Sequence, residues 1–305
     1  MNRKRETFSR ASLALFRSCA VLLRLSAILM ICLGAFSAFA QSQGTRKLTL
    51  ITPEQPDFEA VLSANFPGIQ EFDAYRMVSP FLVVLRNDTS HPAEAYAVMW
   101  ETRAPDGHIL RAQNQYIQQH SSPRTELRPF KPGEVRLLSP WFTLSPHQYN
   151  VQHEDIARLL SSMASSSKVI SQHQFTSVTP TVDAVIYDDG GITGTDRFQL
   201  SLRYQCLRDA ERDEATSVLQ LIETNAPSKE IMDHLRQEAD QAHATKASPK
   251  RRDRASLYAL YRGREAKHLM AVHKVSGDRG LRQRVELSAQ IPQKTLTPLL
   301  PETPQ

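Results

Sequence analysis

The pattern that most narrows the possible folds of this chain is a succession of strand and turn signals between residues 81 and 116. Phe81–Leu85 is a continuous apolar run of strand length, followed by the turn cluster Asn87–Ser90. In residues 95–100, Tyr, Val and Trp alternate with Ala, Ala and Met, which predicts a pleated strand with its large side chains on one face. Pro105–Gly107 then predicts a hairpin turn, and His108–Tyr116 the returning strand.

Further strands are expected on both sides of this hairpin. Lys47–Thr52 is a plausible first strand, the turn Lys131–Glu134 is followed by the apolar Val135–Leu138, and Val182–Tyr187 has strand character. Many short strands separated by turns favour a β-sandwich, in which two sheets bury their facing sides.

The order of these elements resembles the Ig-like or fibronectin-III-like sandwiches common in exported bacterial proteins, over residues 45 to 145, although the paired cysteines of antibody domains are absent. The stretch VDAVIYDDGGITGTD, residues 182–196, resembles a hairpin-to-helix segment of exported bacterial proteins of unknown function. Thr195 stands where those proteins usually have Pro. This resemblance implies export and a scaffold, and no particular activity.

Helical signals take over after Gly194. Asp196 with Gln199 fits an N-terminal capping pair, and apolar residues then recur at three and four until Pro227. Two further helices are expected at Ser228–Ala244 and Asp253–Val275. The predicted fold is α+β: an Ig-like antiparallel sandwich over 45–190 with an irregular insertion near 145–180, a helical region over 196–290, and a disordered or extended tail over 291–305.

The first forty residues predict a cleavable secretory signal. A basic segment precedes the apolar run Leu25–Ala40, which ends in the small-x-small pattern Ala38-Phe39-Ala40, so cleavage is expected after Ala40. The alternative is an uncleaved anchor, but the apolar run is shorter than the about 20 residues that a spanning helix needs. The sequence therefore predicts a periplasmic or extracellular protein.

Removal of the leader changes the charge. The chain has 37 basic and 32 acidic residues, of which residues 1–40 hold six and one, so the mature chain has 31 of each. A neutral total gives no reason to expect nucleic acid as a partner. Only Cys206 remains in the mature chain, so no intramolecular disulfide can form, and its apolar neighbours predict a buried thiol.

Three groups of residues could bind a metal or a phosphate. Asp183, Asp188, Asp189 and Asp196 could offer oxygen ligands to calcium, although a type I′ turn and a helix cap explain the same residues. His147, His153 and His173 with Glu154 and Asp155, or His268 with His273, could offer zinc ligands, but none has the His-Glu-x-x-His spacing. Gly190–Gly194 lacks the Gly-Lys-Ser/Thr ending of a phosphate loop and is interpreted as turn geometry. No cofactor is indicated.

One stretch of the mature chain is strongly basic, between Lys246 and Arg284. It contains twelve basic residues against Asp253, Glu265 and Asp278. The basic residues are Lys246, Lys250, Arg251, Arg252, Arg254, Arg262, Arg264, Lys267, Lys274, Arg279, Arg282 and Arg284. The stretch is either a face for an anionic envelope component or another protein, or a solvated helical face whose charge the rest of the chain balances.

Two functions remain open. The first is a non-enzymatic exported binding or scaffold module. The second is a hydrolase of envelope or extracellular polymer, with Asp188, Asp189, Glu154 or Asp155 as acid and base. A facing pair of these carboxylates in a cleft would favour the enzyme, whereas their dispersal on exposed positions would favour the scaffold.

Overall fold

The computed structural model describes residues 46–118, 128–151, 153–172, 177–244 and 253–299. The chain divides into two units, residues 1–46 and residues 47–305, and the elements below all belong to the second. The predicted leader and its cleavage site after Ala40 lie outside the described residues.

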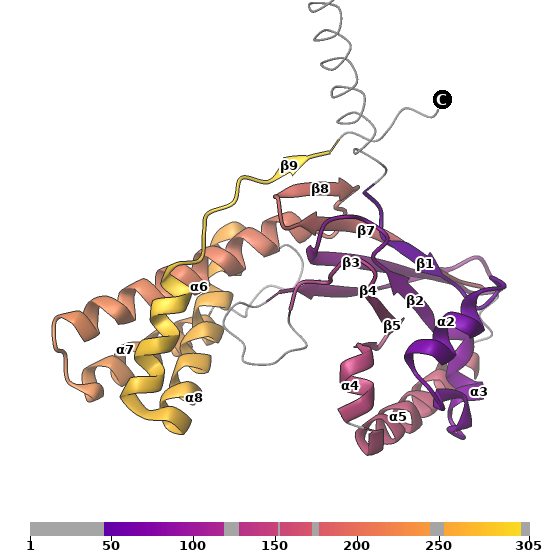
Figure 1. The fold of residues 1–305 in the computed structure, drawn as a ribbon, viewed down its shortest axis with the longest axis horizontal. Helices are drawn as coiled ribbons and strands as arrows, with labels where there is room; N and C mark the ends of the chain where they lie inside the picture. Colours follow the sequence, from indigo (N-terminus) through magenta and orange to yellow (C-terminus); the bar gives the residue numbers. More distant parts are fainter. Residues whose placement is uncertain (1–45, 119–127, 152, 173–176, 245–252, 300–305) are drawn as a thin grey trace, which may run out of the picture. The chain divides into compact units, whose positions relative to one another are not determined.

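Two sheets contain the strands (Figure 1). Sheet A has the order β1-β2-β5-β6 and is antiparallel throughout. Its strands are β1 (Thr49–Ile51), β2 (Val83–Arg86), β5 (Val135–Ser139) and β6 (Phe142–Leu144). Sheet B has the order β4-β3-β7-β8-β9, and only its last pair, β8 with β9, is parallel. Its strands are β3 (Ala93–Arg103), β4 (Ile109–Ile117), β7 (Ser177–Tyr187), β8 (Gly191–Gly194) and β9 (Thr297–Pro298).

The predicted hairpin after residue 103 joins β3 to β4. Ala104 donates its backbone N–H to His108 at 2.8 Å, and Gly107 adopts a positive φ of 84°. Arg103 pairs with Ile109, and the register runs back to Ala95 opposite Ile117.

The two sheets share a core that follows from the period-2 pattern of their strands. Tyr96, Val98 and Trp100 of β3 lie in one buried cluster with Val83 and Leu85 of β2. The indole N–H of Trp100 donates to Asn114 on β4, so its polar atom is satisfied inside this core. The predicted separation of large from small side chains on β3 is confirmed, because Ala95 and Ala97 belong to a different cluster, with Leu200 and Tyr204 of the first C-terminal helix.

Helices cover the other side of sheet A. Val84 of β2 lies in a cluster with Phe58 and Leu62 from one helix and Ile156 and Leu160 from another. The elements on this side are α2 (Phe58–Asn65), η1 (Ile69–Glu71), α3 (Tyr75–Val78), η2 (Ser79–Phe81), α4 (Pro146–Val151) and α5 (His153–Gln172). The segment 145–180, expected to be an irregular insertion, thus holds α4, α5 and the start of β7, because α5 has an apolar stripe that sheet A can bury.

Three helices follow the strands: α6 (Leu200–Glu223), α7 (Ser228–Ala244) and α8 (Arg254–Ala289). The predicted helix Ser228–Ala244 is confirmed. The third helix extends beyond the predicted end at Val275, but Gly277, with φ 64° and ψ −166°, breaks it into two arms. None of the helices in the described ranges is both long and apolar enough to cross a membrane.

The fold is therefore a combination of antiparallel sheets with C-terminal helices, as the sequence predicts. The described part of the tail is extended, one of its two expected forms, and it adds an unpredicted strand to sheet B: β9 pairs with β8, and Leu299 donates its N–H to Ile192 at 2.7 Å. Residues 300–305 lie outside the described residues.

Candidate functional site

The hairpin between β7 and β8 carries two neighbouring carboxylates, Asp188 and Asp189. Gly190 donates its N–H to the carbonyl of Tyr187 at 3.0 Å, and Asp189 Oδ1 accepts the N–H of Gly191 at 3.0 Å. Of these turn residues only Gly190 has a positive φ, 84°, so the predicted type I′ turn is wrong. A type I′ turn needs two consecutive residues with a positive φ, whereas this hairpin closes with Gly190 alone in that conformation.

The connection between β2 and β3 brings His91 to this hairpin. Asn87 is fully buried and organises the connection, because its amide donates to the carbonyls of His91 at 2.9 Å and Phe130 at 2.7 Å. Asp188 donates its backbone N–H to the carbonyl of Pro92 at 2.9 Å, which ties the hairpin to the connection. Backbone and amide hydrogen bonds thus hold the two loops together independently of the side chains that face each other.

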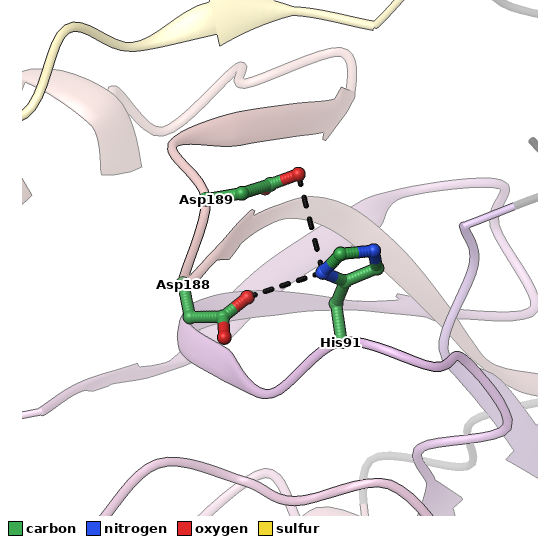
Figure 2. A group of neighbouring side chains, drawn as sticks. All are labelled: His91, Asp188 and Asp189. Atoms are coloured by element: carbon green, nitrogen blue, oxygen red, sulfur yellow. Dashed lines mark hydrogen bonds and ion pairs between the residues drawn. The ribbon is translucent and has the colours of Figure 1, made fainter.

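His91, Asp188 and Asp189 form what we call the turn cluster. His91 Nδ1 lies 3.3 Å from Asp188 Oδ1 and 3.9 Å from Asp189 Oδ2. Figure 2 shows this ring nitrogen directed toward both carboxylates, with the second ring nitrogen pointing away. One ligand atom from each residue lies within 4.8 Å of the others, and the side chains are 31%, 41% and 39% exposed, so the cluster is open to solvent.

A buried charge network adjoins the turn cluster. Glu94, on β3, accepts hydrogen bonds from Lys294 Nζ at 2.6 Å, from Arg208 Nη2 at 3.0 Å and from the Tyr204 hydroxyl. Lys294 Nζ also donates to the backbone carbonyl of Asp188 at 2.7 Å, which joins the network to the turn. Burial opposes ionisation of Glu94, but the bonds from Lys294 and Tyr204 and the charge of Arg208 outweigh it and hold the pKa of Glu94 below its ordinary value.

The four aspartates considered for calcium do not share a site. Asp183 accepts from the Thr195 hydroxyl at 2.8 Å and from the backbone N–H groups of Arg197 and Phe198, both at 3.2 Å. Asp196 accepts from the first N–H groups of α6, those of Leu200 and Ser201, as predicted. The predicted partner Gln199 does not reach back, because it precedes the helix in a left-handed conformation with φ 56°. These two carboxylates shape the approach to α6, so of the four aspartates Asp188 and Asp189 belong to the turn cluster.

The histidines considered for zinc are dispersed. His147 is exposed at the start of α4, and Asp155 on α5 forms an exposed ion pair with Arg158 at 2.7 Å. His153 and Glu154 are the first two residues of α5, and His173 lies outside the described residues. On α8, His273 Nε2 lies 2.9 Å from Asp278 Oδ1, whereas His268 is half-buried.

A second group with metal-ligand side chains lies among the C-terminal helices, formed by Glu214, His234 and Glu238. His234 Nε2 lies 3.2 Å from Glu214 Oε1. A cation already occupies this group, because Arg262 contacts Glu214 at 2.8 Å and Glu238 at 3.2 Å. Burial raises the pKa of Glu214, because its effect exceeds the opposing effect of the Arg262 guanidinium. The group is best described as a buried ion pair.

The cations of the basic stretch Lys246–Arg284 are partly paired with acids and partly exposed. Arg254 pairs with Asp209, and Arg282 lies 3.6 Å from Glu286. Arg262 is engaged with Glu214 and Glu238 as described above, and Arg284 is half-buried. Arg264, Lys267, Lys274 and Arg279 are exposed, and Lys246 to Arg252 lie outside the described residues. Two of these cations, Arg254 and Arg262, therefore link α8 to the other helices.

Two further predictions concern single features. Gly190–Gly194 forms the hairpin turn and β8, as the turn interpretation predicts. Cys206 is fully buried in α6, and burial raises the pKa of its thiol, which makes it a poor nucleophile.

The sequence reasoning missed His91, Glu94 and Lys294. None of the three belongs to a recognisable motif in its own segment, and only the pairing of β3 with β7 and the return of the tail bring them to the hairpin. The chain matches no protein-family model, no curated protein and no solved structure.

Proposed function

We propose that this chain is an exported, non-enzymatic binding module with an Ig-like sandwich as its scaffold, and that its turn cluster binds a divalent transition-metal ion. The observation that carries the proposal is the convergence of one imidazole and two carboxylates, from loops 97 residues apart in sequence, on a single small volume.

The spacing of the ligand atoms suits a zinc-like ion. Zinc binds nitrogen and oxygen ligands at about 2.0–2.2 Å in tetrahedral sites, which puts neighbouring ligand atoms roughly 3.3–3.5 Å apart. The 3.3 Å separation of His91 Nδ1 from Asp188 Oδ1 meets this requirement. Asp189 Oδ2, at 3.9 Å from the same nitrogen, would need to approach by about half an ångström.

The charge of the cluster is also suitable. Two neighbouring carboxylates repel each other, and a divalent cation between them offsets that repulsion. One nitrogen with two carboxylate oxygens is a ligand set for zinc, manganese or iron, whereas calcium takes six to eight oxygens. The metal would bind the imidazole of His91 through Nδ1, so the ring would enter the site as a neutral ligand beside the two carboxylates.

The dispersal of the candidate acids supports a binding role over hydrolysis. Asp188 and Asp189 lie on the β7–β8 turn of sheet B, whereas Asp155 lies on α5, on the far side of sheet A. Two-carboxylate hydrolysis needs its acid and base on either side of one bond. A metal-dependent hydrolase is the second candidate function, favoured by the open side of the turn cluster, because catalytic zinc sites keep a coordination position for water.

Calorimetric titration of the metal-free chain with zinc chloride tests the proposal. The wild type should bind one equivalent of zinc at the turn cluster. Asp188→Asn combined with Asp189→Asn should weaken zinc binding more than 100-fold, because loss of a residue that only supports a metal ligand already costs roughly 10–100-fold. Asp106→Asn is the matched control, because Asp106 is an exposed turn aspartate of the β3–β4 hairpin that accepts the N–H of His108. Equal zinc affinity in the double variant and the wild type would contradict the proposal, as would the absence of binding to the wild type.

A further inference from the structure

A second feature, separate from the turn cluster, is a groove of about 520 Å³ beside the start of β5. We call it the β5 groove. Its polar lining residues are Arg128, Lys131, Glu134, Arg136, Ser145 and His147, among others.

The β5 groove has an excess of positive charge. Arg128, Lys131 and Arg136 face one acid, Glu134, whose carboxylate accepts the backbone N–H of Lys131 at 2.9 Å. Within the described ranges, no carboxylate lies within ion-pair distance of the three cationic side chains. The lining thus keeps a formal charge of +2 with His147 neutral.

Arg136 is the unusual member, because it is a buried cation with neutral partners. The residue is only 6% exposed. Its guanidinium carbon lies 3.9 Å from the ring centre of Tyr116 and 4.8 Å from that of Phe130. It donates to the Tyr96 hydroxyl and to the backbone carbonyl of Arg128, each at 3.3 Å.

These contacts orient the guanidinium but do not neutralise it. Stacking on aromatic rings contributes favourably to a buried guanidinium, yet a charge removed from water without a counter-ion carries a desolvation penalty. An anion in the groove would offset that penalty. The contrast with Arg262 is informative, because that arginine is less buried, with its side chain 25% exposed, and still has Glu214 and Glu238 beside it.

We infer that the β5 groove binds a phosphate-class oxyanion, with Arg136 as the fixed cation and Arg128 and Lys131 as exposed ones. Guanidinium groups present a planar fork of donors that matches phosphate oxygens, and lysine adds a point charge. The groove is large enough for a phosphate ester. An anionic partner was one of two interpretations of the stretch Lys246–Arg284, and this proposal places it instead at a different part of the chain, where the described cations lack acidic partners.

The test is calorimetric titration of the full, metal-free chain with inorganic phosphate at low salt. The wild type should bind one phosphate. Arg128→Gln combined with Lys131→Gln should weaken binding about tenfold or more, because charge-assisted hydrogen bonds are lost. Both residues are exposed, so this variant should fold.

The matched control is Arg264→Gln combined with Lys274→Gln. It removes the same charge from exposed positions of α8, within the basic stretch. Unchanged binding in the control supports a site at the groove. Equal weakening in the two double variants, or no phosphate binding to the wild type, would overturn the proposal. Arg136→Met should lose binding most completely, with its fold checked by circular dichroism.

A second arm separates the sources of the phosphate group. Vesicles containing phosphatidylglycerol are sedimented with the chain, with and without inorganic phosphate. Wild-type chain that sediments with vesicles and is released by phosphate, while the groove variant stays in solution, supports the proposal with a lipid headgroup as ligand. Phosphate binding without sedimentation supports it with a soluble phosphate as ligand. Because this site shares no residue with the turn cluster, its failure would leave the zinc proposal intact.

Discussion

Removal of the charge on Glu94 should destabilise the chain strongly. Glu94→Gln keeps the size of the side chain but leaves Arg208 without its counter-ion. The side chains of Glu94 and Arg208 are only 8% and 7% exposed, so water cannot replace the lost partner. Lys294 is 21% exposed and can turn toward solvent, so Arg208 should dominate the effect.

The magnitude follows from this burial. Breaking a buried ion pair by removing one partner costs about 3–5 kcal/mol, because an uncompensated charge stays inside. The matched control is Glu101→Gln on the same strand, since Glu101 pairs with Arg111 at 2.8 Å while Arg111 is 58% exposed. Exposed pairs contribute about 0.2–1 kcal/mol.

Urea unfolding at pH 7, followed by circular dichroism, measures both free energies of unfolding. Because the pKa of Glu94 is held below its ordinary value of 4.5, the folded chain resists protonation of this group at a pH where the unfolded chain accepts the proton. The stabilisation is therefore full above pH 4.5 and is lost as the pH falls below it. The difference between wild type and Glu94→Gln should shrink in that acid range. A Glu94→Gln variant no less stable than Glu101→Gln at pH 7 would mean that Arg208 does not depend on Glu94 as its counter-ion.

Two further predictions concern the hairpin and the leader. In urea unfolding, Gly194→Ala should destabilise the chain by roughly 1–3 kcal/mol more than the control Gly107→Ala. Both glycines have a positive φ, but a Cβ at Gly194 would lie 2.1 Å from the carbonyl oxygen of Asp183, whereas a Cβ at Gly107 meets nothing within 4 Å. Similar losses of stability in the two variants would contradict this prediction. Intact-mass analysis of the exported chain should give an N-terminus at Gln41, and a chain retaining residues 1–40 would contradict the predicted cleavage.

Local sequence patterns were sufficient to predict much of the fold. The alternation in residues 95–100 and the turn at Pro105–Gly107 predicted β3, its buried face and the hairpin, because side-chain period and turn chemistry act within a few residues. The bond from the N–H of Leu200 to Asp196 at the start of α6 is equally local, but the predicted capping role of Gln199 is wrong, because Gln199 lies before the helix.

Other features depend on contacts that no local pattern contains. The break at Gly277 leaves Val275 85% exposed, although helical spacing would have placed it on the buried stripe. The helices covering sheet A between β1 and β2 went without a prediction. Glu94 and Lys294 are 200 residues apart in sequence, and their bond exists only because the tail returns to sheet B.

The candidate site was only half predictable. Asp188 and Asp189 stand out in the sequence because two carboxylates adjoin a glycine turn, but His91 lies in an unremarkable loop, and only the strand pairing brings it to them. Asp183 and Asp196 stay outside the cluster because their carboxylates accept backbone N–H groups at the approach to α6.

The most direct measurement is an anomalous diffraction map at the zinc absorption edge, from crystals of the chain grown with zinc. We expect one dominant peak between His91 Nδ1 and the carboxylates of Asp188 and Asp189. A dominant peak at Glu214, His234 and Glu238 instead, or no peak at the turn cluster, would contradict it.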